Sequence, residues 1–191
     1  MTVKRSCVRT GGLAGFAAAV LLATGIPGTA AAAEARPGSA TQVTIERGNA
    51  LSCSGEAGGV AVSAELYENS AYGSHASIRV ETAAGVWFGG YGPEHTGIFR
   101  QGRVAASVAL NPRDGGDAAA ADAAVTGTYA RTGKPTRVHE VVEDAGKVIV
   151  TDGLNTSLTV HATATAFGQR VPLTCDTAFA FDLVVRTRDA V

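Results

Sequence analysis

The sequence predicts an all-β fold, and three observations support this prediction. Apolar and polar residues alternate with a period of two in five separate segments of the chain. Turn-forming Gly, Asp and Pro residues separate these segments, and two distant cysteines are available to form one disulfide. We expect about nine or ten strands in total, arranged as a single antiparallel β-sandwich domain over residues 42–191, with a β-barrel as the alternative.

The first 33 residues have the pattern of a secretory signal peptide. They contain, in this order, a positively charged start (Lys4, Arg5 and Arg9), an uncharged apolar run over residues 13–26, and a small-residue cleavage motif that ends at Ala33. The apolar run is too short to predict a membrane-spanning helix. We therefore expect residues 1–33 to be cleaved, residues 34–41 to form a flexible leader, and the mature protein to be secreted.

Charge and composition narrow the classes of partner. The formal net charge of the full chain is −1, and the rest of the chain is more acidic because the charges of the first 33 residues are all positive. No basic stripe remains to bind nucleic acid, and no later segment is long enough to span a membrane. The abundance of Ala, Gly, Val and Arg fits an extracellular protein from a GC-rich bacterium. We expect a monomer without a cofactor, whose partner is an unknown extracellular ligand or protein.

The cysteines predict one disulfide. Cys7 lies before the apolar run, so only Cys53 and Cys175 remain in the predicted mature chain. A pair of cysteines in an oxidising compartment usually forms a structural disulfide. A disulfide between Cys53 and Cys175 would close a loop of more than one hundred residues. Closing it would stabilise the fold by roughly 5 kcal/mol in the chain-entropy model.

The five alternating segments predict strands that are buried on one face. Their apolar positions are Val60 to Leu66, Ala76 to Val80, Val104 to Leu110, Leu158 to Ala166, and Val171 to Phe181. In the last segment Leu173, Cys175, Phe179 and Phe181 share one parity, which places all four on the core face. Cys53 shares the parity of Leu51, so the parity predicts a bridge through the core of the sandwich.

Turn residues predict where the chain reverses. The sequence Asp144-Ala145-Gly146 predicts a tight hairpin with its glycine in the left-handed conformation. Three further reversals are predicted at Asp152-Gly153, at residues 133–135 and at residues 167–169. The longest break covers residues 111–124, where we expect one short helical turn from Asp117 to Ala124.

The best candidate for a binding site lies within residues 86–99. This stretch contains the only tryptophan of the chain, Trp87, together with Phe88, Tyr91, Glu94 and His95 on a Gly-rich connection. Aromatic side chains beside glycine favour a stacking platform for a sugar or a planar ligand. The alternative is structural: an aromatic residue covers the end of the core and the glycines form a turn.

The sequence leans away from catalysis. It lacks the spacing of a zinc protease, the nucleophile elbow of a serine hydrolase and the spacing of a metal site. We therefore expect a non-catalytic binding domain without a metal. One alternative is a small hydrolase or isomerase that uses Glu94 and His95 as an acid–base pair. Another is an inhibitor of a secreted enzyme that presents the loop from Tyr91 to Thr96.

Overall fold

The computed structural model describes residues 41–95, 97–115 and 121–190, and within these the regular structure is entirely β. The strands are β1 (Gln42–Ala57), β2 (Val60–Asn69), β3 (Gly73–Thr82), β4 (Gly85–His95), β5 (Phe99–Arg100), β6 (Arg103–Pro112), β7 (Ala121–Arg131), β8 (Thr136–Asp144), β9 (Lys147–Ala166) and β10 (Gln169–Asp189). The all-β prediction is therefore confirmed. The predicted signal peptide and leader lie outside the described residues, apart from Thr41. No helix in the described ranges has the length and hydropathy needed to cross a membrane.

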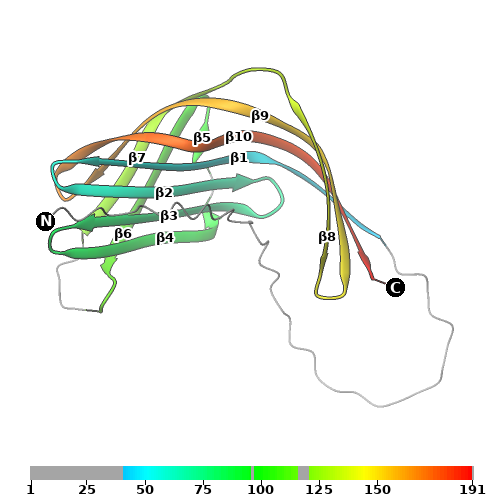
Figure 1. Ribbon diagram of the computed structural model, residues 1–191, viewed down its shortest axis with the longest axis horizontal. Coiled ribbons are helices and arrows are strands. Elements are labelled where there is room, and N and C mark those ends of the chain that lie inside the picture. The colour runs from blue at the N-terminus through cyan, green and yellow to red at the C-terminus, as the bar shows by residue number, and fades with distance from the viewer. Residues whose placement is uncertain (1–40, 96, 116–120, 191) are drawn as a thin grey trace, which may run out of the picture. The chain divides into compact units, whose positions relative to one another are not determined.

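All the strand pairings are antiparallel, and they connect in a continuous order. That order is β10-β1-β2-β3-β4-β6-β7-β9-β8, and β10 also pairs with β9. β10 therefore has β1 on one side and β9 on the other. The pairing of β10 with β9 joins the first strand of this order to the eighth. Figure 1 shows β6 and β7 running steeply behind β1 to β4, so that the core lies between these two groups.

The core consists of the inward-facing residues of these strands. In β6, buried Val104, Ala106, Val108 and Leu110 alternate with exposed neighbours. The alternation that predicted the strands therefore also identifies the buried face. Burying each Val or Leu contributes roughly 1.5–3 kcal/mol before the loss of conformational entropy is counted.

The disulfide between Cys53 and Cys175 is present, and it joins neighbouring strands. The two residues stand opposite each other in the pairing of β1 with β10. The predicted bridge through the core is therefore replaced by a bridge between adjacent strands of one sheet.

A bulge beside the disulfide corrects the predicted face of two aromatic residues. Ser52 pairs with Thr177 whereas Cys53 pairs with Cys175, so Asp176 is an extra residue in β10. The extra residue reverses the parity of the rest of the strand. Phe179 and Phe181 consequently lie on the opposite face from Leu173, although Phe181 is still buried there, with 5% of its surface exposed. There the Phe181 ring stacks on Tyr67, with centroids 5.7 Å apart.

The predicted turns have mixed outcomes. The hairpin at Ala145-Gly146 and the turn at Phe167-Gly168 are confirmed, and each pair has positive φ at both residues. The reversal at residues 133–135 also separates two strands, β7 and β8. The reversal at Asp152-Gly153 is wrong, because β9 continues through it. The helical turn is wrong from residue 121 onward, where β7 begins, and its earlier part lies outside the described residues.

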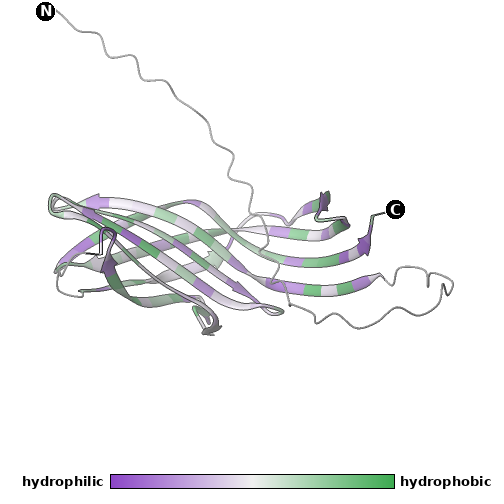
Figure 2. Cartoon of the chain, turned by 90° about the horizontal axis from the view of Figure 1, so that it is seen from below, coloured by the Kyte–Doolittle hydropathy of each residue, from purple (hydrophilic) through white to green (hydrophobic). Residues whose placement is uncertain are grey.

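Four strand segments extend past the ends of β2 and β3, and we call them the arm. They are the start of β1 (residues 42–47), the end of β10 (residues 182–189), the start of β9 (residues 147–154) and β8. Figure 1 shows this arm as the continuation of β1, β9 and β10 beside the β8 hairpin. Figure 2 shows that apolar and polar residues are mixed along these segments.

Candidate functional site

The structure separates the two adjacent aromatic residues of the candidate segment onto opposite faces of β4. Trp87 faces the core and is only 7% exposed, and its ring contacts Phe167 with centroids 4.7 Å apart. Phe88 faces outward and is 39% exposed. The Arg79 guanidinium lies over the Phe88 ring, 5.7 Å from its centroid, and also pairs with Glu81. A cation in this position holds the ring in place on the sheet surface.

Phe88 borders a shallow, wide-open depression along β4, which we call the trench. The trench has a volume of about 460 Å³. Its residues are His75, Ala76 and Ser77 from β3, Phe88 to Gly92 from β4, and Asn111 from β6. Glycine at positions 90 and 92 leaves β4 without side chains beside the phenyl ring. A Cβ atom at Gly92 would meet no atom within 4 Å, so the space above it is open.

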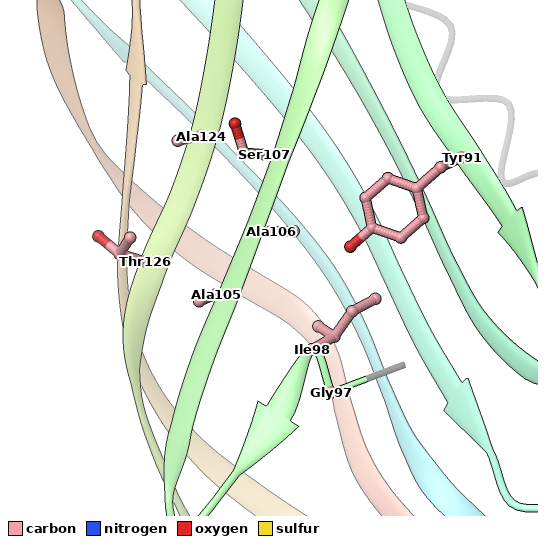
Figure 3. A pocket seen from close by; sticks show the side chains of 8 residues that line it. All are labelled: Tyr91, Gly97, Ile98, Ala105, Ala106, Ser107, Ala124 and Thr126. Carbon is pink, nitrogen blue, oxygen red and sulfur yellow. The ribbon is translucent and has the colours of Figure 1, made fainter. Parts of the chain in front are cut away.

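Tyr91 lines both the trench and a second hollow of about 370 Å³ between β4 and β6. These strands share only two residue pairs, Trp87 with Pro112 and Phe88 with Asn111, and they diverge beyond them. Figure 3 shows the Tyr91 ring reaching from β4 toward β6, with its hydroxyl end directed to Ala106 and Ile98. The half-buried ring therefore occupies the opening left where the two strands separate.

Glu68 fixes the end of this opening. Its carboxylate accepts hydrogen bonds from the backbone N–H of Gly97 at 3.1 Å and of Phe99 at 3.3 Å. It also accepts one from the buried Ser74 hydroxyl at 3.3 Å. Burial, and then the nearby Glu68 charge, raise the pKa of the Tyr91 phenol above its ordinary value. Tyr91 therefore stays neutral at neutral pH.

The remaining residues of the sequence-predicted site are only partly described. Glu94 and His95 belong to β4, where His95 pairs with Ser74, but their side chains lie outside the described part of the structure. The predicted loop is thus a strand with an irregular register between Ser74 and Ala76. Thr96 lies outside the described residues.

The sequence interpretation missed several residues at the site. Glu68 has the same parity as the buried apolar residues of β2, and a carboxylate at such a position was the available signal. His75, Ser77 and Asn111 had no local signal, since only the pairing of β3, β4 and β6 brings them to Phe88.

A second polar cluster lies on the arm, far along the chain from the trench residues. His139 Nδ1 and Asp152 Oδ1 are 2.7 Å apart, and Arg186 donates to the other oxygen of Asp152 at 2.7 Å. The hydrogen bond with His139, followed by that from Arg186, lowers the pKa of Asp152. Within the described residues, no three His, Cys, Asp or Glu side chains are grouped so as to hold a metal ion.

Comparison with known proteins gives no relative: no protein-family model, no curated protein and no solved structure matches this chain.

Proposed function

We propose that this chain is a non-catalytic binding domain and that its ligand occupies the trench along β4. The observation that carries the proposal is an exposed Phe88 ring beside a strip of bare glycine backbone. An aromatic ring fixed in this position offers a flat apolar surface next to free space. Such surfaces bind ligands that have a flat apolar face of their own.

The polar walls of the trench favour a sugar ring over a wholly apolar planar ligand. His75 and Asn111 are exposed, Ser77 is half-buried, and all three border the same hollow as Phe88. A pyranose ring offers C–H groups that stack on the aromatic ring and hydroxyl groups that hydrogen-bond to these side chains. The proposed ligand is therefore a neutral carbohydrate.

We further propose that the protein acts outside the cytosol. The disulfide between Cys53 and Cys175 is compatible with an oxidising compartment. The signal-peptide pattern of residues 1–33 supports the same location.

The binding proposal is tested with an array of neutral hexose oligosaccharides, followed by titration calorimetry on any sugar that binds. Phe88→Ala should weaken binding about two- to twelvefold, because an aromatic stack contributes roughly 0.5–1.5 kcal/mol. Gly92→Val should abolish binding by obstructing the trench beside Phe88, and a Cβ atom at this position meets nothing within 4 Å.

Tyr72→Ala is the matched control, since Tyr72 is an exposed aromatic residue (58%) that does not line the trench. Its affinity should equal that of the unmodified protein. If no sugar binds, or if Phe88→Ala and Gly92→Val bind as well as the unmodified protein, the proposal is overturned.

A further inference from the structure

The arm has a free strand edge at the start of β1. Residues 42–54 of β1 pair with β10, but on the other side the pairing with β2 begins only at Gly48. Arg47 is the last residue before this edge, since its backbone N–H and C=O both bond to Ser70, at 2.9 Å and 2.8 Å. Residues 42–46 therefore have no strand partner on that side among the described residues.

The orientation of Arg47 tells which backbone groups are free. In an antiparallel strand the N–H and C=O of one residue point to the same side, and the side alternates along the strand. Val43 and Ile45 share the parity of Arg47, so their N–H and C=O groups point to the open edge. Their side chains are also open, each being 57% exposed.

This edge is complementary to itself. An antiparallel copy centred on Thr44 pairs Val43 with Ile45 and Gln42 with Glu46, and places Thr44 opposite Thr44. Aliphatic side chains then meet aliphatic ones, an amide meets a carboxylate, and two hydroxyl groups meet at the centre. No like charges oppose each other. The register also falls at the middle of the free segment and brings the outward N–H and C=O groups of Val43 and Ile45 together.

The opposite edge of the arm differs in its chemistry. β8 is the last strand of the order and forms this edge. It contains the ionisable residues Arg137, His139, Glu140, Glu143 and Asp144. An antiparallel copy centred on Glu140 opposes two carboxylates. Charged edge strands of this kind resist pairing with another chain.

We propose that the free edge of β1 is an interaction surface for a second copy of this chain, paired antiparallel about Thr44. The pairing extends the sheet of one arm into the sheet of the other. It covers Val43 and Ile45 of both copies and satisfies their free backbone groups. The edge contains only five residues, so the dimer forms reversibly and depends on concentration. The sequence predicts a monomer instead, and the experiment below distinguishes the two states.

The test is sedimentation of the purified full chain over a range of concentrations, with substitutions at the two-fold axis. The unmodified chain should shift from monomer to dimer as its concentration rises. Thr44→Lys and Thr44→Glu should each weaken the dimer about tenfold or more, because each places two like charges opposite each other. An equal mixture of these two variants should recover the dimer, since the opposed charges then attract. Recovery also shows that both variants are folded.

Val141→Lys is the matched control on β8, where Val141 is 56% exposed. This variant should dimerise like the unmodified chain. A monomer at every concentration, or a dimer that both Thr44 variants retain, overturns the proposal. A dimer lost in Val141→Lys assigns the interface to β8 and also overturns it.

Discussion

Cys53 and Cys175 are direct neighbours across β1 and β10, although 122 residues separate them in the sequence. The bridge therefore fixes the first strand of the described fold to the last. It lies beside the bulge that moves Phe179 and Phe181 to the opposite face of β10 from Leu173.

Removing the disulfide should destabilise the fold markedly. Replacing both cysteines by serine releases a long loop in the unfolded chain, and we expect the free energy of unfolding to fall by about 2–5 kcal/mol. Urea denaturation of the double variant and of the oxidised protein measures this difference. A melting temperature that stays the same under reducing conditions would contradict the expectation.

Gly48 should tolerate no side chain. A Cβ atom there would overlap the Glu68 carbonyl oxygen and lie 2.7 Å from the Phe181 ring. We expect Gly48→Ala to lower the free energy of unfolding by about 1–3 kcal/mol, since overpacking forces its neighbours to move. Gly92→Ala is the control, because its methyl group meets nothing within 4 Å. Equal stability of the two variants would refute this account of Gly48.

The fluorescence of the single tryptophan should be that of a buried indole. Trp87 is 7% exposed and lies against Phe167. We expect a blue-shifted emission that acrylamide quenches slowly, and no change of emission when a ligand enters the trench by stacking on Phe88. A red emission that is readily quenched would place Trp87 in water and contradict the fold at this strand.

Alkaline pH should weaken the fold partly through Tyr91. Its raised pKa means that the folded protein holds the phenol proton more tightly than the unfolded chain does. This contribution to stability is complete below the unfolded pKa of about 10 and is lost as pH rises through the higher folded pKa. We expect the free energy of unfolding to decrease less steeply above about pH 10 in Tyr91→Phe. Identical alkaline profiles for the two proteins would show that Tyr91 has no such role. Burial also raises the pKa of Tyr67, so some decrease remains in the variant.

Local sequence patterns predicted the strands more accurately than the turns. The alternation in β6 was read correctly because each residue of this strand is either inside or outside the core. The Asp152-Gly153 pair was misread as a turn. Position 153 requires glycine because β9 and β10 approach closely there, and a Cβ atom would overlap the Asp182 carbonyl oxygen of β10. A dipeptide cannot distinguish a tight turn from a close approach of two strands.

The candidate site shows the same limit. Phe88 and Tyr91 were selected as aromatic residues beside glycines, and both line the trench. Trp87 was selected on the same ground but faces the core, because adjacent residues of a strand point to opposite faces. The polar walls, His75 and Asn111, come from other strands and could not be found from the segment itself.

The sequence by itself determined the β class, the position of most strands and the pairing of Cys53 with Cys175. These follow from local alternation and from the small number of cysteines, which need no knowledge of neighbours in space. Only the tertiary structure decided that β10 lies between β1 and β9, that Phe181 and Leu173 lie on opposite faces of β10, and that β4 separates from β6 beyond Phe88. These features depend on hydrogen bonds between distant strands. One extra residue in such a pairing reverses every side chain that follows, and no local pattern records it.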